Sequence, residues 1–193
     1  MASTTNSRRA SIGLSEAGLP YRTHAMDLRK GDQRTPEHLA RNPYGKVPVI
    51  VDTEGLNGSP VTVFESGAIL LYAAEKSGKL YGKDPVDRVE VQKWFMLLMS
   101  GAVPYLSALK QHATLRPECD RVVKVIDNHL SKNEYFASEF SIADICLYPR
   151  LVGYEEALFP VGDYKHIKRW MQLVGGRPGV QTGMRAPGSK KVS

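Results

Sequence analysis

The 193-residue sequence is poor in several features, and each shortage excludes a class of protein. Its two cysteines, Cys119 and Cys146, form no C-x-x-C pair and lie in apolar helical patterns. We therefore expect buried thiols in a reducing cytoplasm, not disulfides. No apolar run reaches the roughly 18 residues of a membrane span, so we expect no membrane partner. The basic residues are scattered, and the net charge of +6 predicts mild attraction for anionic ligands but no nucleic-acid partner.

The sequence also lacks the spacings of common catalytic and metal centres. Its five histidines are isolated. No metal-ligand spacing, Ser-His-Asp arrangement or carboxylate pair can be identified. We expect no bound metal, and any chemistry has to come from other features.

The most informative stretch runs from Lys46 to Tyr72. Its first part is a β-branched run bounded by turn residues, which predicts a buried strand, and Val61 to Phe64 predicts the antiparallel partner of that strand. Glu65 and Ser66 then lead directly into a helix. The apolar face of that helix is spaced at helical periodicity, and the helix ends at Ser77-Gly78.

Two features of this stretch suggest a ligand site. A cis bond at Val47-Pro48 would expose the Val47 backbone as a free edge, whereas the more common trans bond would make Pro48 an ordinary edge proline. Ser66 begins a helix that has no capping box, so its first N–H groups and dipole favour a carboxylate or phosphate. Glu65 beside it would suit an ammonium group. The alternative for Ser66 is a plain N-cap.

The remaining elements predict two domains. A helix over 7–17, a strand over 21–28 and a helix beginning at Thr35-Pro36 precede the strand pair, which gives an α/β domain over residues 1–78. Residues 84–177 are expected to be entirely helical, and residues 178–193 a flexible tail. Ser141 and Asp144 predict a capping box inside the helical domain.

Two motifs carry a family resemblance that extends over nearly the whole chain. Asn42-Pro43-Tyr44-Gly45-Lys46-Val47-Pro48 and Phe64-Glu65-Ser66-Gly67-Ala68-Ile69 resemble the glutathione-binding half of cytosolic glutathione transferases. The resemblance is nearest to the theta-related branch that includes the nu class and the Ure2-like proteins. It implies a thioredoxin-like domain, without its first β-strand here, followed by an all-α domain.

The resemblance also implies which residues bind glutathione as co-substrate. Thr4 and Asn6 would be the catalytic donors to its sulfur. The other implied glutathione-binding residues are Gln33, Lys46, Val47, Pro48, Glu65 and Ser66. The tripeptide's glycine end would meet Gln33, its cysteine backbone would pair with Val47, and its γ-glutamyl end would meet Glu65 and Ser66.

Two functions follow from the resemblance. The first is an enzyme, which joins glutathione to a small electrophile or uses it to reduce a disulfide or peroxide. The second is a non-catalytic glutathione transferase-like module that binds partners. Relatives are usually dimers, so we expect a cytoplasmic homodimer. We expect the loss of the first strand to affect catalysis more than the fold.

Overall fold

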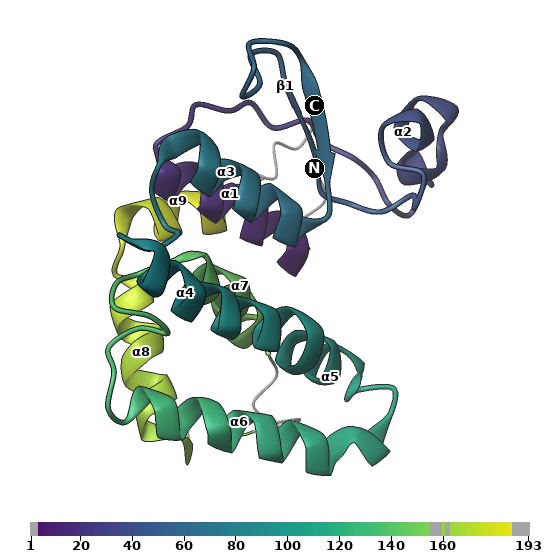
Figure 1. Ribbon diagram of the computed structural model, residues 1–193. Coiled ribbons are helices and arrows are strands. Elements are labelled where there is room, and N and C mark those ends of the chain that lie inside the picture. The colour runs from purple at the N-terminus through teal and green to yellow at the C-terminus, as the bar shows by residue number, and fades with distance from the viewer. Residues whose placement is uncertain (1–3, 155–159, 161–162, 187–193) are drawn as a thin grey trace. The chain divides into compact units, whose positions relative to one another are not determined.

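The computed structural model describes residues 4–154, 160 and 163–186. The chain forms two compact units, one built from Met1–Gly78 together with Pro178–Ser193 and the other from Lys79–Arg177. Figure 1 shows their elements. In the described part of the chain, no helix is long and apolar enough to cross a membrane.

The first unit packs helices against a β-hairpin. Its elements are α1 (Thr5–Ala17), η1 (Asp32–Arg34), α2 (Pro36–Arg41), β1 (Val49–Asp52), β2 (Val61–Phe64), α3 (Ser66–Ser77) and α9 (Pro178–Arg185). Thr4 caps α1 and Thr35 caps α2, each side-chain oxygen accepting a backbone N–H of the first turn. The predicted helix beginning at Thr35-Pro36 is confirmed.

The hairpin confirms the predicted antiparallel pair but not its burial. Val49 pairs with Phe64, and Asp52 pairs with Val61. Val51 is 54% exposed and Phe64 39% exposed. The prediction of a buried strand is therefore wrong, because among the described residues the sheet has only these two strands, with α3 packed nearby.

A polar cluster attaches the hairpin to α3. The Asp52 carboxylate accepts hydrogen bonds from Lys76 Nζ and, at 2.7 Å, from the Tyr72 hydroxyl. The bond from Lys76, followed by that from Tyr72, lowers the pKa of Asp52 to about 2. Burial and the bond to Asp52 raise the pKa of Tyr72 to about 12. The cluster is thus strongest with the carboxylate ionised.

The strand predicted over residues 21–28 does not form. This segment is extended or turning chain that contributes nothing to a sheet. A strand is stabilised by ladder hydrogen bonds to a neighbour, and the two-stranded sheet of the described residues offers this segment none. The alternation of side chains in this segment was therefore not sufficient to predict a strand.

The C-terminal segment is a second correction. Residues 178–185, expected to be part of a flexible tail, form α9, which packs against α1. A Cβ atom on Gly183 would lie 2.4 Å from the Ile12 Cα, so glycine permits this close approach. The Glu16 carboxylate also accepts the Val180 N–H at 3.0 Å. The last helix therefore supports the helix that opens the unit.

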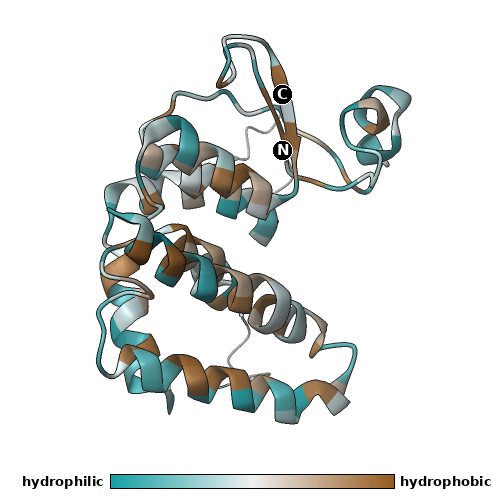
Figure 2. Cartoon of the chain, in the orientation of Figure 1, coloured by the Kyte–Doolittle hydropathy of each residue, from teal (hydrophilic) through white to brown (hydrophobic). Residues whose placement is uncertain are grey.

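The second unit is helical throughout its described elements. These are α4 (Pro85–Leu97), the π-helix η2 (Leu98–Ala102), α5 (Val103–Ala108), η3 (Ala113–Leu115), α6 (Arg116–Leu130), α7 (Ile142–Val152) and α8 (Lys165–Gly175). Hydrophobic and hydrophilic residues alternate along α6 in Figure 2, as expected for an amphipathic helix.

The N-terminus of α7 is closed by the protein's own side chains. Ser141 and Asp144 form the predicted capping box. The Asp144 carboxylate also accepts the indole N–H of Trp170 at 2.8 Å and the backbone N–H of Phe136 at 3.3 Å. Asp144 is fully buried. Burial raises the pKa of its carboxyl to about 6, although these hydrogen bonds oppose the rise.

Candidate functional site

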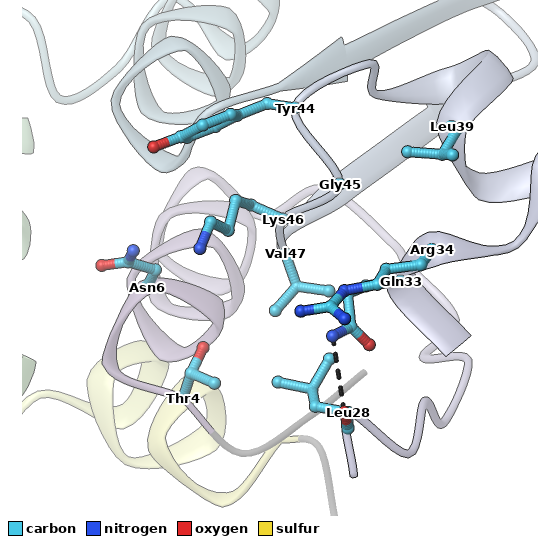
Figure 3. Close-up of a pocket in the computed structure, with 10 residues that line it drawn as sticks. All are labelled: Thr4, Asn6, Leu28, Gln33, Arg34, Leu39, Tyr44, Gly45, Lys46 and Val47. Atoms are coloured by element: carbon cyan, nitrogen blue, oxygen red, sulfur yellow. Dashed lines mark hydrogen bonds between the residues drawn. The ribbon is translucent and has the colours of Figure 1, made fainter. Parts of the chain in front are cut away.

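Two neighbouring cavities lie within the first unit. The larger, of about 420 Å³, is lined by Thr4, Asn6, Leu28, Gln33, Arg34, Leu39, Tyr44, Gly45, Lys46 and Val47 (Figure 3). The smaller, of about 250 Å³, is lined by Asn6, Asn42, Tyr44, Lys46, Val47, Pro48, Glu65 and Ser66. The four lining residues that they share make them one continuous candidate site. All the site residues predicted from the sequence line one or both cavities.

The Lys46-Val47 segment at the centre of the site is fixed by hydrogen bonds to its backbone. The Lys46 carbonyl oxygen accepts hydrogen bonds from Asn42 Nδ2 and His38 Nε2, each at 2.9 Å, and both side chains are buried. The Val47-Pro48 peptide bond is cis, which was the less common of the two alternatives. Among the described residues, no hydrogen bond engages the N–H or C=O of Val47. This peptide group can therefore pair with an extended ligand.

The start of α3 provides hydrogen-bond donors to the smaller cavity. Glu65 occupies the N-cap position with φ 70° and makes no side-chain cap bond, and Ser66 is the first helical residue. Ser66 is thus not the plain N-cap of the alternative interpretation. The Glu65 carbonyl accepts the Ile69 N–H at 2.9 Å, and within the described structure the N–H groups of Ser66, Gly67 and Ala68 have no such partner. A helix start with free N–H groups suits a carboxylate.

The start of α1 brings two predicted residues to the larger cavity, in different states. The Thr4 hydroxyl accepts the Ser7 N–H at 3.1 Å and donates to Ser7 Oγ at 2.9 Å, so it is engaged as a cap. Asn6 is exposed and lines both cavities. Its Oδ1 accepts a hydrogen bond from Arg9 Nη1 at 3.0 Å. The Asn6 amide is therefore the better placed donor for a ligand.

Gln33 and Arg34 form the far wall of the larger cavity. Gln33 Nε2 already donates to the Leu28 carbonyl oxygen at 3.4 Å, as the dashed line in Figure 3 shows. The exposed Arg34 guanidinium lies beside it. An arginine suits a carboxylate better than an amide does, so Arg34 is the stronger anion-binding candidate at this end.

Sequence reasoning missed four residues of this region: Arg9, Arg34, Asn42 and Tyr44. Asn42 and Tyr44 lie inside the quoted motif, so their position beside Lys46-Val47 was the available signal. Arg34 follows Gln33 directly. Arg9 carried no such signal, because a basic residue on an amphipathic helix is ordinarily at the surface. No metal site was predicted, and the described residues contain no group of three or more metal-ligating side chains.

Two family models match most of the chain. The glutathione S-transferase N-terminal domain matches residues 5–76, and the glutathione S-transferase C-terminal domain matches residues 90–178. The disulfide-bond oxidoreductase YfcG of Escherichia coli is 31% identical over 92% of this chain and 89% of its own. Glutathione S-transferase F10 of Arabidopsis thaliana is 34% identical over 89% of this chain and 88% of its own.

Solved structures agree with these matches. A glutathione transferase from Pseudomonas putida, with one glutathione disulfide bound per subunit, superposes with a TM-score of 0.91 at 32% identity and covers 97% of this chain and 90% of its own. One from Burkholderia graminis, with two glutathione molecules per subunit, gives a TM-score of 0.90 at 32% identity over 97% of this chain and 87% of its own.

Proposed function

The chain belongs to the glutathione S-transferase family, and we propose that it is an enzyme that binds glutathione in the two joined cavities and activates its thiol. The observation that carries the proposal is the open Val47 peptide beside the uncapped start of α3. Together they offer a backbone edge and an anion site to a short peptide that bears both charges. The glutathione bound to the relatives from Pseudomonas putida and Burkholderia graminis supports the same ligand.

The γ-glutamyl end of the tripeptide occupies the smaller cavity. Its carboxylate accepts hydrogen bonds from the Ser66 hydroxyl and from the first-turn N–H groups of α3. The Glu65 carboxylate, exposed at the same rim, pairs with its ammonium group. The cysteinyl backbone pairs with the N–H and C=O of Val47, a contact to which Pro48 contributes by shaping the wall.

The glycyl end lies in the larger cavity. Lys46 and Arg34 carry positive charges there, and Gln33 lines the same wall. Because Gln33 Nε2 is bonded to Leu28, we assign the glycyl carboxylate to the two cations, with Gln33 as a wall residue. This assignment leaves the cysteinyl sulfur facing the start of α1.

Thiol activation falls to Asn6 and Thr4. A cysteine thiol has a pKa of about 8.5, so most of it is protonated at neutral pH. Hydrogen bonds from the Asn6 side-chain amide or backbone N–H favour the thiolate, and each unit of pKa depression corresponds to about 1.36 kcal/mol. Thr4 contributes less, because its hydroxyl is already bonded to Ser7.

The activated thiolate can react with three kinds of substrate. It can add to a small electrophile, forming a carbon–sulfur bond and expelling a leaving group. It can also attack a disulfide, forming a mixed disulfide and releasing a thiolate, after which a second glutathione attacks the mixed disulfide to give glutathione disulfide and the second thiol. With a peroxide, the thiolate attacks one oxygen to form a sulfenic acid and releases the other oxygen as alkoxide or hydroxide. A second glutathione then condenses with the sulfenic acid to give glutathione disulfide and water.

A glutathione-binding module without turnover is the second candidate. The engaged Thr4 hydroxyl favours it, since one of the two predicted sulfur donors is already satisfied by the protein. The proposal also includes membership of the nu and Ure2-like branch, a homodimer, and a cytoplasmic location consistent with two buried cysteines that form no disulfide with each other. The absence of the first strand stays a prediction.

The test begins with binding. Isothermal titration of the wild-type protein with glutathione should give saturable binding, and Glu65→Ala combined with Ser66→Ala should weaken it at least about tenfold, as expected for lost charge-assisted hydrogen bonds. Glu75→Ala, which removes a carboxylate from α3 outside the cavities, is the matched control. Unchanged affinity in the double variant would overturn the proposed site.

Turnover then separates enzyme from module. Wild-type protein with glutathione should convert a chlorinated aromatic or reduce hydroxyethyl disulfide. Asn6→Ala should lower that rate far more than it lowers the affinity for glutathione, because the donor acts on the thiolate. Binding without turnover of a chlorinated aromatic, a disulfide or a peroxide would favour the non-catalytic module.

A further inference from the structure

Arg9 is a buried charged residue of the first unit to which the proposed chemistry assigns no role. Its residue is 1% exposed, which is unusual for arginine. Its Nη1 donates to Asn6 Oδ1 at 3.0 Å and to Ser66 Oγ at 2.8 Å. One terminal nitrogen carries two hydrogens, so this single group joins a residue at the start of α1 to a residue at the start of α3.

The bond to Asn6 fixes which way the amide faces. A guanidinium can only donate, so the oxygen of the amide has to face Arg9. Nδ2 is then directed away from Arg9, and no hydrogen bond to another described residue engages it. Because Asn6 lines both cavities, this leaves the N–H donors of its amide available to a ligand atom there.

The bond to Ser66 has the same consequence at the other end. Ser66 Oγ accepts from Arg9, so its own O–H remains free to donate, and within the described structure it donates to no protein atom. The guanidinium is charged at every accessible pH. Its charge is shielded from water by burial, which strengthens its effect on anions bound nearby.

We propose that Arg9 is a positioning residue that couples the two ends of the glutathione site, by holding the Asn6 amide for the thiolate and the Ser66 hydroxyl for the γ-glutamyl carboxylate. The inference rests on the proposed function and adds to it a residue that touches neither reacting atom. It predicts that occupation of one end prepares the other, because both donors depend on one nitrogen.

A purely structural Arg9 would behave differently. If it only joined α1 to α3, its loss would lower the melting temperature and leave the ionisation of bound glutathione unchanged. The pKa of the bound thiol, followed by thiolate absorbance in the ultraviolet as a function of pH, is therefore the deciding measurement. Binding of S-methylglutathione, which has no ionisable thiol, reports the γ-glutamyl end separately.

The central variant is Arg9→Met, which keeps length and removes the charge and the donors. We expect glutathione to bind at least about tenfold more weakly and the pKa of the bound thiol to rise by about one unit. S-methylglutathione should also bind more weakly, through Ser66. Arg29→Met removes an exposed charge of the same unit that lines neither cavity, and should match wild type in all three measurements.

Two further variants keep the test decisive if Arg9→Met does not fold. Arg9→Lys retains the charge without the planar fork, and should restore part of the affinity while leaving the thiol pKa raised. Asn6→Ala and Ser66→Ala leave Arg9 in place, and their effects on glutathione affinity should be non-additive, because each removes one acceptor from the same nitrogen.

The outcomes separate the inference from the function on which it rests. Wild-type protein that does not bind glutathione would overturn both. Wild-type binding with an unchanged thiol pKa in Arg9→Met, or in Arg9→Lys where only that variant folds, would overturn the inference alone. Strict additivity of Asn6→Ala and Ser66→Ala would also overturn it.

Discussion

The helices α3 and α7 both have a serine at their N-terminus, but only α7 is capped by side chains of the protein. At α7, the Ser141 hydroxyl oxygen accepts a hydrogen bond from the Ala143 N–H at 3.2 Å, and the Asp144 carboxylate accepts one from the Ser141 N–H at 3.0 Å. At α3, Ser66 makes no cap, and its hydroxyl accepts a bond from Arg9 instead. At α7 the hydrogen-bond donors of the helix start are satisfied by the protein, whereas at α3 the first N–H groups and the Ser66 hydroxyl are available to a ligand.

The difference extends to the surroundings of each helix. Asp144 lies among donors from three segments of the helical unit and is fully buried. Glu65, at the corresponding end of α3, is exposed and makes no cap bond. A buried network whose polar groups are all hydrogen-bonded stabilises a domain. Polar groups that lack protein partners at the edge of a cavity lower stability but can bind a ligand. Local closure therefore distinguishes a structural capping site from a binding site that begins with the same residue type.

The largest effect on stability should come from removing Asp144, which caps the start of α7. Asp144→Ala leaves the Trp170 indole N–H and two backbone N–H groups buried without their acceptor, which should cost about 3–5 kcal/mol. Thermal unfolding followed by circular dichroism should show the helical unit melting far earlier or failing to fold. Asp120→Ala removes only a surface pair with Arg116 and should cost under about 0.5 kcal/mol. Equal shifts for the two variants would contradict the comparison.

The pH dependence of stability should also differ between the two units. Because the pKa of Asp144 is raised to about 6, the stability it contributes is complete below about pH 4 and is lost as pH rises through 6. The loss amounts to about 2–3 kcal/mol, since the folded protein holds this proton longer than the unfolded chain. The pKa of Asp52 is lowered to about 2, so its contribution is present above about pH 4 and is lost only on further acidification.

Denaturant unfolding between pH 4 and 7 measures this contrast. The stability difference between wild type and Asp144→Asn should shrink across the window, because the variant has no proton to lose there. The difference between wild type and Asp52→Asn should change by only about 0.3 kcal/mol, because folded Asp52 is ionised throughout this range and the unfolded carboxyl finishes ionising just above pH 4. A constant Asp144→Asn difference would show that burial does not raise this pKa.

The third prediction concerns the packing of α9 against α1, the helix that carries Asn6 of the candidate site. A Cβ atom on Gly183 would lie 2.4 Å from backbone atoms of Ile12, so Gly183→Ala should push α9 away from α1 and cost about 1–3 kcal/mol. Since α1 carries Asn6, glutathione affinity should fall as well. Gly176→Ala, where the nearest atoms are 3.5 Å away, should change neither stability nor affinity. Retained affinity and stability in Gly183→Ala would show that α9 does not support the site.

Sequence reasoning succeeded where one segment contains its own signal. The apolar helical pattern around Cys119 forms α6, in which Cys119 is buried as expected, and the predicted capping box of α7 is present. It failed over residues 21–28, because a strand also needs a neighbour that alternation cannot supply. It missed α9, because a short segment with glycine and proline becomes helical mainly through packing against α1.

The candidate site was predictable to a similar degree. Val47, Glu65 and Ser66 line one cavity, as the motif pair implied. The engagement of Thr4 as a cap and the burial of Arg9 were not predictable. Both depend on contacts that only the folded chain creates, in the case of Arg9 with a residue 57 positions away.

The sharpest test exchanges the two serines for alanine, one at a time. Ser141→Ala removes a cap and should cost about 1 kcal/mol of stability. Ser66→Ala removes no cap, so its effect on stability should be smaller. For glutathione affinity the order should reverse, with Ser66→Ala binding several-fold more weakly and Ser141→Ala binding like wild type. Melting temperatures and titration calorimetry on both variants give the four values. A protein in which the two substitutions had the same profile would not distinguish a closed helix start from an open one, and the assignment of α3 as the ligand-binding end would then have no support from its missing cap.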